Sequence, residues 1–248
     1  MIFTVAQREL KALFLSPLAW VVLALVQFIV AYLFLIHLDQ YLLIQPQLAT
    51  LDNPPGVSEY LIARLFLPAS SIYLMVMPLL TMRLISEELQ SGSFALLLSA
   101  PISMTEIVLG KYVALMSLLS LMLLLTALMP LSLLMAVPVD LAALALAVLG
   151  CWLLLAAFAA IGLYFSSLTA QPLLAAVGAF ALLLFLWLIN ATGQSEGAEL
   201  LDYLALSAHL RGFLSGVLQS VDLIYYLLLV VAFLGLAIRR LDNMRLND

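Results

Sequence analysis

Six apolar runs along the chain are each close to the length of a membrane-crossing helix. About 20 apolar residues in a helix cross about 30 Å of hydrocarbon. The runs cover residues 18–38, 63–82, 107–136, 141–168, 173–189 and 223–238. Only 9% of the 248 residues are charged, whereas soluble domains average about 25%. The sequence therefore predicts an all-α polytopic membrane protein with six transmembrane helices, forming one transmembrane domain over residues 1–248.

Basic residues are divided unequally between the two sides of the predicted membrane domain. Six crossings place both termini and the segment between the second and third runs on one side. That side holds Arg8, Lys11, Arg83, Lys111, Arg239, Arg240 and Arg245, and the other side holds Arg64 and Arg211. Because basic residues favour the cytoplasmic side, we expect a multi-pass protein of the inner (cytoplasmic) membrane with both termini in the cytoplasm.

Polar residues and prolines in and between the runs carry local expectations. Gln27 is the lone polar residue in the middle of the first run, where a hydrogen bond to another helix is favoured over a role in lining a path. Pro130 removes a backbone hydrogen bond and marks the expected break of the third run. Turn residues at 53–56 predict an outside loop over residues 39–61. Residues 166–172 are expected to form a bare connector on the inside.

The segment over residues 84–106 is longer than a plain connector between two helices requires. It opens with two acidic residues, and a Ser-Gly-Ser break follows at 91–93. Residues 94–98 then form a short apolar helix candidate outside any span, closed by Pro101. Such a helix at the membrane surface is suited to docking into a partner protein; resting on lipid headgroups is the alternative.

This segment resembles the cytosolic coupling segment of ABC-2 type transporter permeases. In that family an acidic stretch leads into Gly-Thr-x-Glu-x-Leu-Leu, a Pro-hydrophobic-Ser turn and Gly-Lys. The chain matches at residues 87–88, 92–98, 101–103 and 110–111, with Ala95 where the family usually has Glu. The resemblance implies an ATPase-coupling site made of Glu87, Glu88, Gly92, Phe94, Leu96, Leu97, Leu98 and Pro101.

Residues 1–15 alternate between apolar and polar side chains on two faces. A helix of this kind lies in the membrane interface, with its basic residues toward anionic headgroups; an ordinary charged flank is the alternative. The family has an elbow helix at this place. The resemblance therefore implies an N-terminal amphipathic elbow helix over residues 1–15.

The extracytoplasmic segment over residues 191–222 is too apolar for a solvated loop and too polar for a span. A crossing helix here would bury Arg211, which costs about 2.5–3.5 kcal/mol at the bilayer centre. We therefore expect re-entrant or surface-lying helices before the sixth span. His209, Phe213, Gly216 and Asp222 resemble the corresponding segment of gliding-motility-type permeases, the closest subgroup. Interface anchoring is favoured over a gate as the role of His209 and Asp222.

The resemblance implies a permease subunit that works with separate proteins. ATP and Mg²⁺ would be bound by a partner ABC ATPase in two copies, and a second permease copy would complete a homodimer or pair of similar chains. A periplasmic accessory protein is a further possible partner besides the lipid bilayer. The chain itself has no phosphate-binding loop of the Gly-x4-Gly-Lys-Ser/Thr type, so we expect no enzyme activity and no cofactor in it.

Other functions are weighed against this one. No Cys/His cluster suggests a metal site, and the charges lie in short loops, so nucleic-acid binding is not expected. A secondary carrier or channel is disfavoured because no span carries an acidic or basic residue near its centre. A non-transporting scaffold that relays force to a periplasmic partner is the other alternative. The resemblance favours export or extraction of a substrate that the sequence does not identify.

Overall fold

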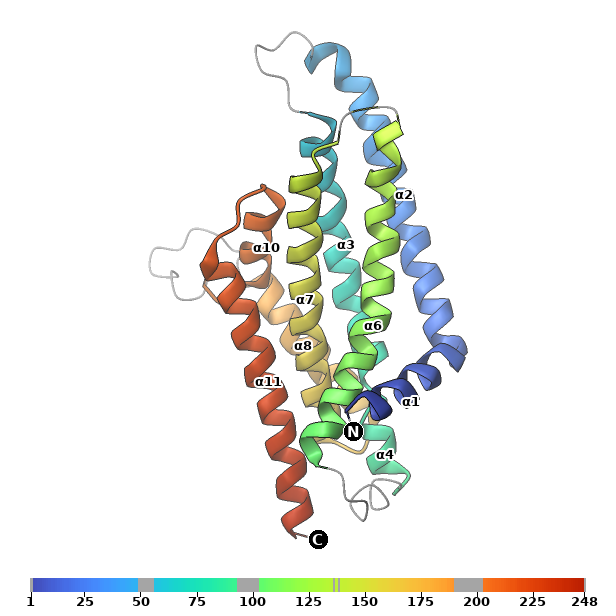
Figure 1. The fold of residues 1–248 in the computed structure, drawn as a ribbon, viewed down its shortest axis with the longest axis vertical. Coiled ribbons are helices and arrows are strands. Elements are labelled where there is room, and N and C mark those ends of the chain that lie inside the picture. Colours follow the sequence, from blue (N-terminus) through green and yellow to red (C-terminus); the bar gives the residue numbers. More distant parts are fainter. Residues whose placement is uncertain are drawn as a thin grey trace.

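The computed structural model describes residues 2–48, 56–92, 103–135, 137, 139–189 and 203–247. Long helices run side by side along one axis of the molecule (Figure 1). The long axial helices are α2 (Pro17–Leu48), α3 (Val57–Thr81), α6 (Met104–Leu131), α7 (Leu141–Leu168), α8 (Pro172–Leu188) and α11 (Ser220–Asn247). The shorter elements are α1 (Ile2–Leu15), α4 (Ser86–Gln90), the 3-10 helix η1 (Ser132–Met135) and α10 (Leu206–Leu214).

The short helices define two ends of the bundle. α1, α4 and the C-terminus lie together at one end, the α4 end, and α10 lies toward the other, the α10 end (Figure 1). α1 lies across the bundle rather than along it and packs against α6. The chain thus places both terminal segments and α4 at the same end, as the predicted orientation requires.

α7 forms the centre of the bundle. It contacts α3, α6, α8, α10 and α11, and residues 153–163 are almost all fully buried. Many of these residues are Ala or Gly, which allow neighbouring helices to approach closely. The small residues of the fourth apolar run therefore account for its central position.

Five helices of the described part are long and apolar enough to cross a membrane. They are α2, α3, α6, α7 and α11. The predicted fifth run forms α8, an apolar helix of 17 residues that is shorter than the other five. An all-helical membrane protein is confirmed, and by length five of the six expected crossings are present in the described residues.

Two predicted boundaries were wrong because helices continue beyond the apolar runs. The expected outside loop at 39–61 is largely helical: α2 extends to Leu48 and α3 begins at Val57. The last run was expected to end at residue 238, but α11 continues to Asn247. Hydropathy reports the continuously apolar part of a helix, whereas packing of single apolar residues such as Tyr41 and Leu241 extends the helix further.

The helix tightens near Pro130, the site at which a break was expected, without an interruption of the span. α6 ends at Leu131 and is followed by η1. Proline lacks the N–H that would continue the ladder of backbone bonds. The third run is therefore one long helix with a tightened end, within a candidate span that covers Met104–Met135.

A polar cluster joins three helices inside the bundle. The Gln27 amide of α2 donates to the Met122 carbonyl at 2.7 Å and to the Thr126 hydroxyl at 3.3 Å. The Tyr73 hydroxyl of α3 lies 2.7 Å from the same Thr126 oxygen. Each polar group is satisfied by a neighbouring helix, as lipid surroundings demand. The prediction that Gln27 bonds to another helix is confirmed.

Candidate functional site

The chain leaves α3 through a turn that α7 holds in place. The Ser166 hydroxyl accepts hydrogen bonds from the Ile85 and Ser86 N–H groups, at 3.0 and 3.1 Å. The same hydroxyl donates to the Met82 carbonyl at 3.1 Å. A side chain on Gly162 would overlap Thr81, so the two helices touch just before this turn. The position of α4 is therefore fixed by α7.

Ser166 was missed as a structural residue by the sequence analysis. Residues 166–172 were expected to form a bare connector, but Ser166 and Ser167 belong to the last turn of α7 and are fully buried. The available signal was a pair of polar residues ending a run of Ala and Gly. Small hydroxyl residues at such places satisfy backbone groups of a neighbouring chain segment.

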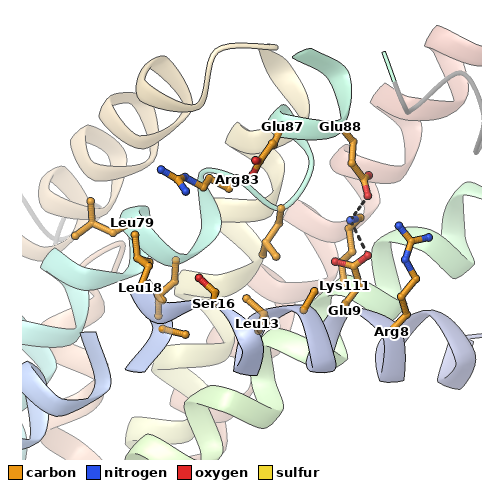
Figure 2. A pocket seen from close by; sticks show the side chains of 14 residues that line it. Arg8, Glu9, Leu13, Ser16, Leu18, Leu79, Arg83, Glu87, Glu88 and Lys111 are labelled. Atoms are coloured by element: carbon orange, nitrogen blue, oxygen red, sulfur yellow. Dashed lines mark hydrogen bonds and ion pairs between the residues drawn. The ribbon is translucent and has the colours of Figure 1, made fainter. Parts of the chain in front are cut away.

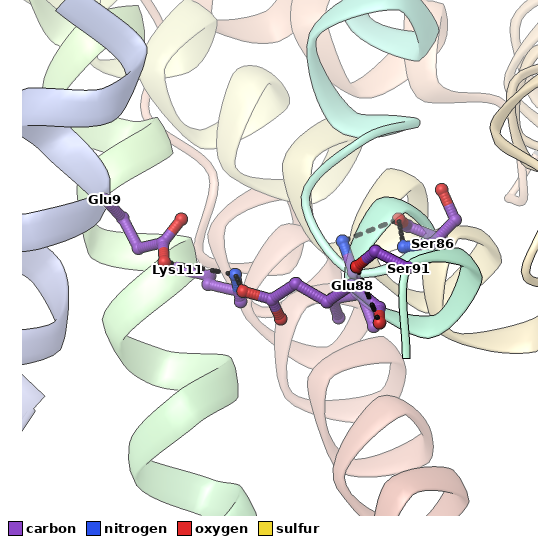
Figure 3. A network of polar contacts seen from close by, with 7 residues as sticks. Glu9, Ser86, Glu88, Ser91 and Lys111 are labelled. Atoms are coloured by element: carbon purple, nitrogen blue, oxygen red, sulfur yellow. Dashed lines mark hydrogen bonds and ion pairs between the residues drawn. The ribbon is translucent and has the colours of Figure 1, made fainter. Parts of the chain in front are cut away.

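Lys111 joins three elements at the α4 end (Figure 3). Its ammonium lies 2.8 Å from the Glu88 carboxylate of α4 and 3.2 Å from the Glu9 carboxylate of α1. The Lys111 side chain is 2% exposed, and the two carboxylates are also largely covered. Buried charges persist only when paired, so this three-residue cluster, Glu9–Lys111–Glu88, ties α1 and α4 to the start of α6.

Gly110 explains how α1 reaches Lys111. A Cβ atom at Gly110 would lie 2.7 Å from Val5 Cγ1 and 3.3 Å from the Ala6 backbone nitrogen. The missing side chain lets α1 lie directly on α6. The adjacent Gly-Lys pair thus does two things at once: Gly110 admits α1, and Lys111 fixes it by an ion pair.

The expected ATPase-coupling residues lie only partly within the described residues. Glu87 is exposed, whereas Glu88 turns inward to Lys111. Gly92 has a φ of +71°, a left-handed conformation that glycine adopts without strain, and it ends the described part of the segment. The structure does not describe Phe94, Leu96, Leu97, Leu98 and Pro101. Their docking role stays a prediction.

The segment re-enters the bundle at a well-defined helix start. Ser103 caps α6 by accepting a hydrogen bond from the Glu106 N–H at 3.2 Å. The Glu106 carboxylate in turn accepts one from the Ser103 N–H at 3.1 Å. This capping box satisfies two backbone donors reciprocally. α6 therefore has a fixed start at Ser103.

The predicted extracytoplasmic residues meet at the α10 end. His209 Nδ1 of α10 lies 2.6 Å from the Asp222 carboxylate of α11, and its Nε2 lies 2.9 Å from the Tyr203 carbonyl. The imidazole also stacks on the Tyr225 ring, with centroids 4.1 Å apart. Because a carbonyl oxygen can only accept, Nε2 donates to Tyr203 and Nδ1 faces the carboxylate. Sequence reasoning had identified no partner for either His209 or Asp222.

Two further predicted residues shape the same region. Phe213 packs where Gly150 of α7 leaves room, since a side chain on Gly150 would overlap its ring. Gly216 has a φ of +77° in the turn that follows α10. The Tyr226 hydroxyl donates to the Leu206 carbonyl at 2.9 Å. The four residues His209, Phe213, Gly216 and Asp222 thus hold α10 against α7 and α11.

α10 is a nine-residue helix, too short to cross a membrane. Its Arg211 is exposed, while His209 and Phe213 are buried. A short helix packed on the bundle before the last span agrees with the expectation that the later part of 191–222 forms no further crossing. Residues 191–202 of that segment lie outside the described part. The geometry of α10 fits anchoring of the α10 end.

Among the described residues, no group of three or more His, Cys, Asp or Glu side chains could hold a metal ion. The buried charges lie toward the two ends of the bundle, at the Glu9–Lys111–Glu88 cluster and at His209–Asp222. The polar groups between them, around Thr126, bond to one another. The described part therefore offers connections between helices rather than a set of reacting groups.

A bundle of long apolar helices with its charges at the two ends is the architecture of a multi-pass membrane protein. A family model described as ABC-2 family transporter protein matches residues 3–246. The chain therefore belongs to the ABC-2 transporter family and is a transmembrane transport component. No curated protein matches the chain.

Proposed function

We propose that this chain is the permease subunit of an ATP-driven transporter, in which a separate ATPase drives export or extraction of a substrate. The observation that carries the proposal is the Lys111–Glu88 contact of 2.8 Å. It joins the segment expected to bind the ATPase to the first turns of a membrane-crossing helix. A displacement of that segment would be passed to the bundle through a buried ion pair.

The connections of α4 give the route for such a movement. α4 is bonded to α7 through Ser166 and to α6 and α1 through Lys111. An ATPase that pushed residues 92–103 on nucleotide binding would therefore transmit force to α1, α6 and α7 at the same time. In this mechanism α1 serves as the elbow helix and residues 94–98 as the coupling helix.

The charge distribution supports the orientation in this proposal. The α4 end carries the seven basic residues named above, and the α10 end carries Arg64 and Arg211. By the positive-inside rule the α4 end lies in the cytoplasm, where an ATPase can reach it. In this proposal α8 is the fifth crossing and α11 the sixth, so that both termini lie on the cytoplasmic side of the inner membrane.

The proposed partners are those that the family implies. Two ATPase copies would bind ATP and Mg²⁺, and a second permease copy would form the other half of the pathway. A periplasmic accessory protein could contact α10, in which case the chain would relay force rather than move cargo itself. A secondary carrier is less well supported, because the buried charges of the described residues lie near the ends of the bundle.

The test is purification of the tagged chain from its own membranes in mild detergent. We expect an ATPase with a phosphate-binding loop to copurify in equal amount, and the complex to hydrolyse ATP. The chain stripped of partners should show no saturable binding of labelled ATP. Micromolar binding of ATP by the chain alone, or a purified chain without any copurifying ATPase, would contradict the proposal.

A further inference from the structure

A pocket of about 390 Å³ opens at the α4 end between α1, the start of α2, the end of α3 and α4 (Figure 2). It lies beside the start of α2 at Pro17 and the end of α3 at Thr81. A bilayer that surrounds these helices would therefore have its headgroup region level with the pocket.

One wall of the pocket is apolar. Leu13 of α1, Leu18 of α2 and Leu79 of α3 line it together (Figure 2). The Leu79 side chain is 45% exposed, so this wall is open to the surroundings of the bundle. An open apolar surface at this depth suits an acyl chain.

The rest of the lining is charged, with three basic residues and three acidic ones. The basic residues are Arg8, Arg83 and Lys111, and the acidic ones are Glu9, Glu87 and Glu88. Lys111 is held by Glu9 and Glu88. Within the described part of the chain, neither Arg8 nor Arg83 forms an ion pair. The pocket thus presents two guanidinium groups together with the exposed carboxylate of Glu87.

We propose that the pocket binds one glycerophospholipid whose headgroup carries both a phosphate and an ammonium group, as phosphatidylethanolamine does. The Arg83 guanidinium, which lies on the same side of the pocket as Leu18 and Leu79 (Figure 2), binds the phosphate, because guanidinium forms paired hydrogen bonds with phosphate oxygens. Glu87 accepts the ammonium group. The acyl chains lie over Leu18 and Leu79. Equal numbers of basic and acidic lining residues favour a headgroup without net charge over an anionic one.

The consequence of this site is a lipid placed against the joint between α1, α3 and α4. The lipid contacts the same elements that the Glu9–Lys111–Glu88 cluster connects. It adds a second link between the bundle and α4. The site is independent of the ATPase, since every group in it belongs to this chain.

The experiment is native mass spectrometry of the purified full-length chain, without partners, after addition of phosphatidylethanolamine. The measured quantity is the fraction of chains that retain one lipid. We expect Arg83→Gln to lower this fraction at least tenfold and the matched Arg239→Gln to leave it unchanged, since Arg239 is exposed at the same end on α11. Ala12→Phe, which fills the pocket from α1 without changing charge, should lower it as well.

Competing ligands distinguish a phosphatidylethanolamine site from a site for another lipid or for free phosphate. Glu87→Gln should abolish the preference for phosphatidylethanolamine over phosphatidylglycerol, which lacks the ammonium group. Displacement of the lipid by millimolar inorganic phosphate would show a phosphate site and overturn the proposal. Equal retention in Arg83→Gln, Ala12→Phe and wild type would also overturn it. A melting temperature measured in lipid-free detergent shows that each variant is folded.

Discussion

The Lys111 ammonium lies 2.8 Å from the Glu88 carboxylate, across 23 positions of sequence. The described chain ends at Gly92 after α4 and resumes at Ser103 before α6. The ion pair therefore joins the helix that precedes residues 93–102 to the helix that follows them. A force applied to the residues between Gly92 and Ser103 would reach α4 and α6, which this ion pair holds together.

Lys111→Met tests how much the Lys111 ion pairs contribute to the stability of the chain. The change leaves two largely buried carboxylates, Glu9 and Glu88, without their cation, and removing one partner of a buried pair costs about 3–5 kcal/mol. We expect a clearly lower melting temperature of the purified chain. Lys11→Met is the matched control, since Lys11 is exposed on α1. A Lys111→Met chain as stable as the control would show that the ion pairs do not stabilise the contacts of α6 with α1 and α4.

Gly110→Ala tests the contact between α1 and α6. The added Cβ would lie 2.7 Å from Val5 Cγ1, and overpacking costs about 1–3 kcal/mol. We expect lower stability that Val5→Gly, which removes both Cγ1 and Cβ of residue 5, partly restores in the double variant. Gly235→Ala is the control, because nothing lies within 4 Å of a Cβ there and replacing a helical glycine gains up to about 1 kcal/mol. Additive effects at positions 5 and 110 would refute the contact.

The His209–Asp222 pair predicts coupling between α10 and α11. Contacting residues show interaction energies of about 0.5–3 kcal/mol in double-mutant cycles. We expect His209→Ala and Asp222→Asn each to destabilise the chain, and the double variant to cost less than their sum. Thermal unfolding of the four proteins supplies the measurement. Arg211→Gln on the exposed face of α10 should have little effect, and strict additivity of the two changes would exclude the pair.

Leu97→Asp tests the proposed coupling helix. An anchoring leucine in an interface is worth roughly 1.5–3 kcal/mol on burial, and a carboxylate in its groove would be unpaired. We expect ATPase recovery in pull-down to fall at least tenfold while membrane insertion stays normal. Ala95→Glu, which introduces the residue usual in the family, should be tolerated. Normal ATPase recovery with Leu97→Asp would remove residues 94–98 from the interface.

Single-cysteine labelling tests the orientation. Cys151 is the only cysteine and is fully buried, so Cys151→Ser gives a background without a reactive thiol. Ser91→Cys at the α4 end should react only with membrane-permeant reagents in intact cells. Ser215→Cys at the α10 end should react with impermeant ones. The reverse pattern would place α4 outside and exclude ATPase coupling there.

Local signals in the sequence located most helices of the bundle. α7 covers the predicted residues 141–168 because Asp140 caps its start and the Thr169 backbone is extended at its end. α8 likewise begins at Pro172, a favoured first helical residue. A run of apolar residues between such signals forms a helix in a membrane, because its backbone groups must bond within the segment.

Contacts between distant segments could not be predicted in the same way. Glu9 and Lys111 lie on α1 and α6, and Ser166 bonds to a turn 80 positions earlier. No periodicity relates such residues, because their meeting depends on how whole helices pack. His209 and Asp222 were identified individually from the family resemblance, but their contact follows from the turn at Gly216, whose geometry is set by the fold.

The ion-pair cluster also constrains the order in which the protein is made. Glu9 and Glu88 leave the ribosome before Lys111, since the chain grows from its N-terminus. Until the third apolar run has entered the membrane, both carboxylates lack the cation that makes their burial tolerable. α1 and α4 therefore reach their final positions only after the start of α6 has been synthesised. Biogenesis of the α4 end is complete no earlier than that step.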